Sequence, residues 1–218
     1  MGDELIDVLD DGMEIVGQAP RSEVHAKGYW HRAFHCWVVS EGPAGEASLV
    51  FQLRSKDKDL VPNSLDVSAA GHLLTGENPT DGLRELEEEL GVNAHIDSLA
   101  FLGVHVDVCC RDGYINREFD YTYLIRDDRD LLEYRVQPSE VTGLSRIAVQ
   151  DGIDLFAGRV DSIECQSVLF DDTGRPDGST FVQRLRISSF AGGARNNYFI
   201  RVFLLARRYL AGDDLLFI

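Results

Sequence analysis

The segment from Gly71 to Val92, GHLLTGENPTDGLRELEEELGV, constrains the fold more than any other part of the chain. Asn78 followed by Pro79 is typical of a helix start, and Gly91 is typical of a helix end. At 100° per residue, the leucines between these limits fall on one face of the helix. They are Leu83, Leu86 and Leu90. The sequence therefore predicts a loop followed by an amphipathic helix that packs its leucines against a core.

The same helix carries four crowded glutamates, and like charges at helical spacing repel one another. Glu85, Glu88 and Glu89 share a face, whereas Glu87 falls outside it and is expected to meet solvent. A solvated acidic face, partly neutralised by Arg84, is the simplest explanation. A divalent cation is the alternative, because Mg²⁺ prefers oxygen ligands and turns mutual repulsion into shared coordination.

Charge and composition exclude several classes of partner. The 21 basic and 37 acidic residues give a net charge of −16, which disfavours binding to nucleic acid. No apolar run is long enough for a bilayer span, and the acidic N-terminus lacks the features of a secretory signal. The four cysteines show no metal-binding spacing, which favours reduced thiols in a cytoplasmic protein.

Short strands surround the acidic helix in the sequence pattern, and a helix closes the chain. We therefore expect one α/β domain over residues 1–218, with N-terminal strands within about 1–30 and a C-terminal helical extension over about 159–218. Strands are expected at 4–9, 13–19, 31–40, 47–55, 96–108, 118–126 and 141–149, and helices at 150–158 and 196–212.

The Gly71–Val92 segment resembles the box of the Nudix hydrolases, G-x5-E-x7-R-E-U-x-E-E-x-G-U, in which U is a bulky aliphatic residue. Every specified residue type is present. The matching positions are Gly71, Glu77, Arg84, Glu85, Leu86, Glu88, Glu89, Gly91 and Val92. One departure is that six residues, not seven, separate Glu77 from Arg84, which leaves the placement of Glu77 open.

The resemblance implies a Nudix-type α/β/α sandwich with a mixed β-sheet. It also implies cleavage of a nucleoside diphosphate linked to another group, with Mg²⁺ or Mn²⁺, and it makes a homodimer plausible. Glu88 and Glu89 would be the main metal ligands, and Glu85 a further ligand or the general base. A backbone carbonyl near Gly71 and the carboxylate of Glu118 would complete the ligand set, while Arg84 would orient a helix carboxylate.

Substrate contacts are expected from the polar loop before the box. Arg54, Lys56 and Lys58 are candidates for binding a diphosphate, although a solvated loop explains them equally well. Glu77 is a further candidate for substrate binding. Glu140 lies where some family members contact substrate, and a structural role is at least as good an explanation.

Two alternatives to a hydrolase remain. The segments VHAKGYWHRAFHCWVV and SAAGH resemble the isopentenyl-diphosphate isomerase branch of the superfamily, which binds a metal near the positions of His25, His31 and His72. Ala70 stands where that branch has its catalytic cysteine, so the resemblance favours hydrolase chemistry. Whether the histidines bind a metal here stays open at this point. A non-catalytic binding module is disfavoured by the intact glutamates.

Overall fold

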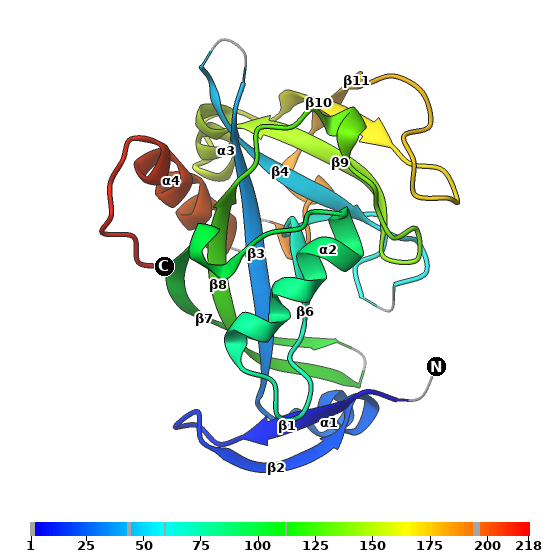
Figure 1. The fold of residues 1–218 in the computed structure, drawn as a ribbon, viewed down its shortest axis with the longest axis vertical. Helices are drawn as coiled ribbons and strands as arrows, with labels where there is room; N and C mark the ends of the chain where they lie inside the picture. The colour runs from blue at the N-terminus through cyan, green and yellow to red at the C-terminus, as the bar shows by residue number, and fades with distance from the viewer. Residues whose placement is uncertain (1–2, 43–44, 59, 112, 194–196) are drawn as a thin grey trace.

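The computed structural model describes residues 3–42, 45–58, 60–111, 113–193 and 197–218 (Figure 1). Within these ranges a mixed nine-stranded sheet forms the centre of the fold. Its strands are β3 (His31–Glu41), β4 (Ala47–Arg54), β5 (Leu65–Asp66), β6 (Ala69–His72), β7 (Leu99–Arg111), β8 (Tyr114–Arg126), β9 (Val141–Ala148), β10 (Ile163–Leu169) and β11 (Phe181–Leu185). The described helices are α1 (Arg21–Lys27), α2 (Arg84–Leu90), α3 (Val149–Phe156) and α4 (Tyr198–Leu210).

The main sheet follows the order β11-β10-β9-β4-β3-β8-β7, with β5 paired to β4 and β6 paired to β3. Strands β3 and β8 run parallel and the other pairs are antiparallel. A separate two-stranded sheet of β1 (Leu5–Leu9) and β2 (Ile15–Pro20) lies with α1 beside one end of β3 (Figure 1). The predicted α/β fold with a mixed sheet is thus confirmed.

Helices cover both faces of the sheet because β3 alternates two apolar sets along its length. Phe34 and Val38 face the side where Leu86 and Leu90 of α2 are fully buried. Trp37 belongs to the second core, which α3 and α4 complete. Figure 1 shows α2 crossing one face of the sheet while α3 and α4 pack on the other. This layering is the expected α/β/α sandwich.

The acidic helix begins with a tight turn instead of a full α-helical turn. Residues Pro79–Leu83 form a 3₁₀ helix, η1, and the α-helix starts only at Arg84. Asn78 is the N-cap residue of η1 as expected, and its backbone amide donates to Asp81 Oδ2 at 2.7 Å; Gly91 ends α2 at φ +64°. A Cβ at Gly82 would collide with Phe34, so glycine lets η1 lie directly on β3.

The C-terminal part of the chain contains more than the predicted helix. Helix α4 is present, and in addition β10 and β11 extend the main sheet beyond β9. These strands were not predicted from the sequence. The longest helix in the described residues has 13 residues, and none of them has the length and hydropathy of a bilayer span.

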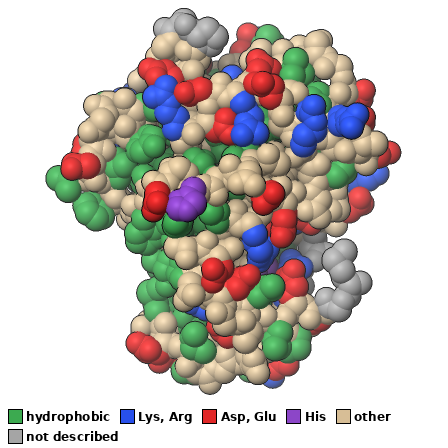
Figure 2. All heavy atoms as spheres, viewed as in Figure 1, with side chains coloured by type: hydrophobic (Ala, Val, Ile, Leu, Met, Phe, Trp, Pro, Cys, Tyr) green, Lys and Arg blue, Asp and Glu red, His purple; other side chains and the backbone are tan. Residues whose placement is uncertain are grey.

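Acidic and basic side chains are interspersed over the face that carries α2 (Figure 2). Asp and Glu are numerous there, as the net charge of −16 predicts.

Candidate active site

Arg84 gathers the acidic residues of the box around one guanidinium group. Its Nη1 lies 2.5 Å from Glu85 Oε1 and 3.4 Å from Glu88 Oε2. Its Nε lies 3.1 Å from Glu77 Oε1, and Nη2 donates to the carbonyl of His72 at 3.1 Å. The shortened spacing therefore does not displace Glu77, which also accepts a hydrogen bond from the Leu74 amide at 2.7 Å.

Glu85 is buried at the point where α2 meets β6. Its carboxyl group fills the space that a Cβ at residue 71 would occupy, so Gly71 is the residue that admits it. Burial raises the pKa of Glu85, while the adjacent Arg84 opposes that shift. The glycine of the box and its first helix glutamate are thus coupled by direct packing.

Glu89 is held on the inner side of α2, with only 3% of its surface exposed. Its Oε2 accepts hydrogen bonds from the Ala70 amide at 3.0 Å and from Gln52 Nε2 at 3.2 Å. Burial, followed by the charge of Glu85, raises the pKa of Glu89 to about 8. Gln52 was missed by sequence reasoning, because nothing near the box points to a glutamine on β4.

The remaining helix glutamates differ in exposure. The Glu88 side chain is 52% exposed and borders Arg84, whereas Glu87 is exposed as expected. No ion pair to Glu89 is found in the described part of the chain. A buried carboxyl group with no ion-pair partner, on which the charge of Glu85 acts, has the donor chemistry of a Mg²⁺ or Mn²⁺ site.

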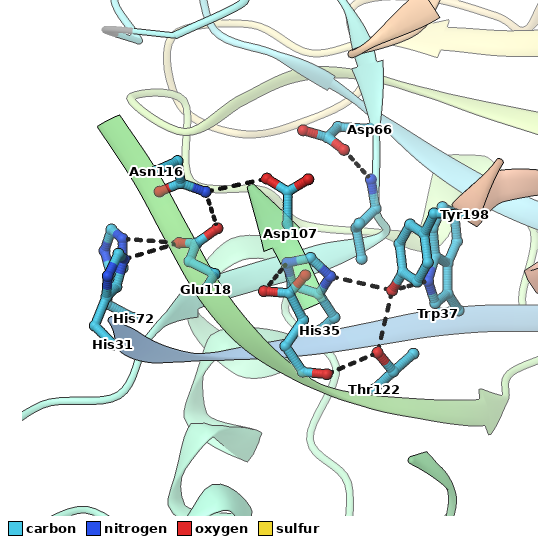
Figure 3. A network of polar contacts seen from close by, with 12 residues as sticks. His31, His35, Trp37, Asp66, His72, Asp107, Asn116, Glu118, Thr122 and Tyr198 are labelled. Carbon is cyan, nitrogen blue, oxygen red and sulfur yellow. Dashed lines mark hydrogen bonds and ion pairs between the residues drawn. The ribbon is translucent and has the colours of Figure 1, made fainter. Parts of the chain in front are cut away.

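Three histidines from separate segments converge beside this region. The ring centroids of His25 and His31 lie 4.8 Å apart, and that of His72 lies 5.2 Å from each. Potential ligand atoms of the three lie within 4.8 Å of one another, the only such group of three in the ranges described. Glu118 Oε1 lies 3.2 Å from His31 Nε2 and 3.3 Å from His72 Nε2 (Figure 3). His25, His31 and His72 therefore form one cluster, with Glu118 beside His31 and His72.

The protonation of the histidine cluster fits a metal site. Neither ring nitrogen of His25 has a hydrogen-bond partner among the described residues. Burial, together with the neighbouring His31, lowers the pKa of His25 to about 3, so its imidazole is neutral. Neutral imidazole is the form that binds transition metals. Glu118, expected as an additional metal ligand, lies with the histidines, and Asn116 donates a hydrogen bond to its second oxygen.

Of the basic side chains in the loop before the box, Arg54 and Lys58 lie near the helix glutamates and Lys56 does not. Burial lowers the pKa of Lys58, and the charges that act on it come from Glu89, Arg54, Arg21 and Glu85, so these groups share one neighbourhood. Lys58 pairs with Glu140, and Arg54 Nη1 lies 3.2 Å from Asp66 Oδ2. Lys56 is exposed and is not brought to this neighbourhood by any described contact.

Arg21 is a basic residue that sequence reasoning missed, since no motif marks the start of α1. It borders a cavity of about 380 Å³ that reaches His25. The lining residues are Asp3, Arg21, Ser22, His25, Ala26, Gly113 and Tyr114. This cavity borders the histidine cluster at His25, on the α1 side.

Similar proteins support the family expected from the box. No protein-family profile matches the chain. The chain is 37% identical over 176 residues to an uncharacterized Nudix hydrolase of Clostridium acetobutylicum, covering 80% of this chain and 84% of that protein. It is also 37% identical over 157 residues to Nudix hydrolase 3 of Arabidopsis thaliana, covering 69% of this chain and 20% of the plant protein.

The fold has a counterpart among solved structures. A crystal structure from Deinococcus radiodurans superposes with a TM-score of 0.53 at 24% identity, covering 71% of this chain and 90% of that one. At this identity the likeness concerns the fold alone.

Proposed function

The chain belongs to the Nudix hydrolase family, and we propose that it cleaves a diphosphate linkage in a nucleoside diphosphate derivative with Mg²⁺ or Mn²⁺. The family assignment itself makes it a hydrolase of a diphosphate-containing substrate. The observation that carries the finer proposal is the arrangement of three box glutamates, Glu77, Glu85 and Glu88, around Arg84. Arg84 thus holds the three carboxylates close together, and that of Glu85 packs against Gly71.

The proposed roles follow from these contacts. Glu88 and Glu89 are metal ligands, Glu85 is a further ligand or the general base, and the carbonyl of Gly71 completes the set. A bound divalent ion would neutralise phosphate charge and lower the pKa of water. Arg84 holds Glu85 and Glu88 in place, and the Ala70 amide and Gln52 orient Glu89.

We assign a second cation site to His25, His31 and His72, with Glu118 as its carboxylate. The unpartnered nitrogens of His25 and the short separation of the ligand atoms support it. Nitrogen ligands select a transition metal in preference to Mg²⁺. The glutamate site and the histidine site are adjacent at Gly71 and His72. Arg84, which pairs with the box glutamates, also donates a hydrogen bond to the His72 carbonyl.

The phosphates of the substrate are proposed to meet Arg21, Arg54 and Lys58. All three lie in the neighbourhood of Glu85 and Glu89, where they offset the negative charge of a diphosphate. Lys56 is dropped from this role because it is exposed. Residues 1–218 act as one domain in this proposal, since β10, β11 and α4 complete the sheet and its core.

An isomerase is the second candidate, and the histidine cluster is the observation that favours it. Ala70 argues against an isomerase, because its side chain offers no thiol for proton transfer. It lies on β6, opposite His35 of β3. An assay for dimethylallyl diphosphate formed from isopentenyl diphosphate separates the two activities. Isomerisation without phosphate release would overturn the hydrolase proposal.

A substrate panel with Mg²⁺ and Mn²⁺ tests the proposed function. It contains nucleoside diphosphate sugars, dinucleoside polyphosphates, NADH, ADP-ribose, nucleoside triphosphates and prenyl diphosphates. We expect metal-stimulated cleavage of a nucleoside diphosphate derivative, detected as nucleotide or phosphate release. If no compound is cleaved with either metal, the proposal is wrong.

A further inference from the structure

Strand β7 lies at one end of the main sheet, so one of its edges has no neighbouring strand in the described residues. From Gly103 to Arg111 its pairing with β8 is regular. The chain end approaches β7 before that stretch, where the Ile218 amide donates to the Leu102 carbonyl at 2.9 Å. A regular edge with unpaired backbone groups is a template on which another strand can pair.

The sequence of β7 does little to block such pairing. Edge strands are commonly kept short or protected by lysine and proline. Strand β7 has 13 residues, and from Leu99 to Cys110 it contains no lysine, arginine or proline and only one carboxylate, that of Asp107. The edge is therefore long and nearly uncharged, although the whole chain has a net charge of −16.

One face of this edge carries exposed apolar side chains. Val106 and Val108 are 51% and 55% exposed. Val106 lies opposite Phe119 of β8, whose ring stacks on Trp30 with centroids 4.6 Å apart. Alternate residues of a strand share a face, so Val104 and Val108 lie on the same face as Val106. Figure 2 shows hydrophobic side chains gathered where Figure 1 places β7, and such a patch beside a free edge indicates an interaction surface.

The five residues from Val104 to Val108, V-H-V-D-V, are symmetric about Val106 in a way that fits a second copy of the chain. When two such strands pair antiparallel with Val106 on a two-fold axis, Val106 faces its counterpart and Val104 faces Val108 of the other copy. On the opposite face, His105 of each copy faces Asp107 of the other. Apolar cross-strand pairs and pairs of complementary polar groups both stabilise a sheet, so the edge is complementary to itself.

His105 and Asp107 keep hydrogen-bonding capacity for this contact. The His105 ring stacks on Tyr198 with centroids 4.3 Å apart, and neither ring nitrogen has a hydrogen-bond partner in the described residues. Asp107 Oδ2 accepts a hydrogen bond from Asn116 Nδ2 at 3.2 Å, whereas Oδ1 accepts none within the described ranges. Tyr198 and Asn116 thus orient the two side chains and leave an imidazole nitrogen and a carboxyl oxygen for each other's counterpart.

We propose that two copies of the chain associate through the β7 edge, with their β7 strands antiparallel about Val106 and their main sheets joined into one continuous sheet. The inference goes beyond the proposed function and does not depend on hydrolysis. The ladder is short, which places the contact among the small specific interfaces, and the dimer should therefore dissociate with a Kd on the order of 1–100 µM.

Sedimentation velocity of the full chain tests this interface at about 1–200 µM protein and about 0.15 M salt, which screens repulsion between the acidic chains. The mass of the unchanged protein should rise with concentration from 24.3 kDa toward twice that value. Val106→Arg brings two like charges together on the two-fold axis and should weaken association at least about tenfold. Val182→Arg is the control, because Val182 is 71% exposed on β11, at the opposite end of the sheet, and should leave association unchanged.

A charge exchange tests the register itself. His105→Asp places two carboxylates opposite each other, and Asp107→Lys places lysine opposite histidine, so each variant alone should associate more weakly than the unchanged protein. An equimolar mixture of the two should form a mixed dimer, because each introduced charge then faces an opposite one. This arm also decides the outcome if Val106→Arg does not fold, which thermal melting shows.

Three results would overturn the inference. They are a monomer throughout the concentration range, a dimer that withstands Val106→Arg as well as it withstands Val182→Arg, and a mixture of His105→Asp and Asp107→Lys that associates no better than either variant alone. The first result would leave the β7 edge to a different partner, and the second would place the dimer contact on another surface. Hydrolysis of a panel substrate is unaffected as a conclusion by any of them.

Discussion

The carboxyl group of Glu85 occupies the space that a side chain at Gly71 would need. This contact joins the loop that precedes the helix to the first acidic residue of α2. A glycine is required there by packing, since the φ angle of Gly71 is not among the left-handed ones. The relation explains why the glycine and the glutamate belong to one motif although fourteen positions separate them in number, from 71 to 85.

Replacing Gly71 by alanine should therefore move Glu85 and damage the site. We expect kcat/KM to fall about 10- to 100-fold, because small displacements of reacting groups are costly in an active site. Overpacking should also lower the free energy of unfolding by about 1–3 kcal/mol. Steady-state kinetics and urea unfolding measure the two effects. Gly17→Ala is the control, because nothing lies within 4 Å of the added methyl group. Equal activity of the two variants would contradict this role for Gly71.

Among the glutamates of α2, we expect substitution of the proposed ligand Glu88 to lower activity and substitution of Glu87 to leave it nearly unchanged. Glu88→Gln removes a charge from the proposed metal site and should lower kcat about 100-fold or more. Glu87→Gln removes the same charge from the same helix, but its side chain is exposed outside the site, so activity should change less than about twofold. Turnover of the best panel substrate is measured over a range of Mg²⁺ concentrations. Full activity of Glu88→Gln would show that the ligand assignment is wrong.

The histidine cluster should bind one transition-metal ion per chain. After incubation with Zn²⁺ or Mn²⁺ and desalting, elemental analysis should give close to one ion in the unchanged protein and a large loss in His25→Ala. Binding of the ion to the folded state should also raise the melting temperature. His95→Ala, at an exposed histidine, should retain the metal. The same metal content in both variants would exclude His25 as a ligand.

The local part of the site follows from the residue pattern alone, whereas His25, His31 and His72 were suggested only by a family resemblance, which left their role open. Gly71, Arg84 and the helix glutamates lie close in the chain, so helical periodicity predicts their grouping. The histidines come from α1, β3 and β6, and their meeting depends on strand register, which places Ala33 opposite His72 and His31 opposite Glu118. Register is set by the whole sheet and cannot be derived from a single strand.

The same limit applies to the residues behind the site. Thr122 of β8 and Tyr198 of α4 lie together, with their hydroxyl oxygens 3.3 Å apart, although 76 positions separate them in the sequence. Strands β10 and β11 were not predicted. Strand β10 alternates between buried and exposed side chains only over its first five residues, and β11 buries only its last side chain, so apolar Phe181 and Val182 are exposed. The core leucines of α2, in contrast, were predicted correctly, since Leu86 and Leu90 are fully buried.

Acid should destabilise the protein through His35. Burial lowers the pKa of His35 to about 4, below its usual value of 6.5. Between these values the unfolded chain binds a proton that the folded chain does not, so the free energy of unfolding decreases as the pH falls from about 6.5 to 4. The contribution of this one group is on the order of 2–3 kcal/mol.

Urea unfolding at pH 7 and pH 4.5 measures this effect. His35→Gln removes the titrating group and should lose less stability between the two pH values than the unchanged protein, by about 1–2 kcal/mol. The exposed histidine supplies the control, since His95→Gln should show the same loss as the unchanged protein. Parallel losses in His35→Gln and His95→Gln would mean that His35 is not a source of the acid sensitivity. The comparison is made between variants at each pH, so the other buried groups that titrate in this range cancel.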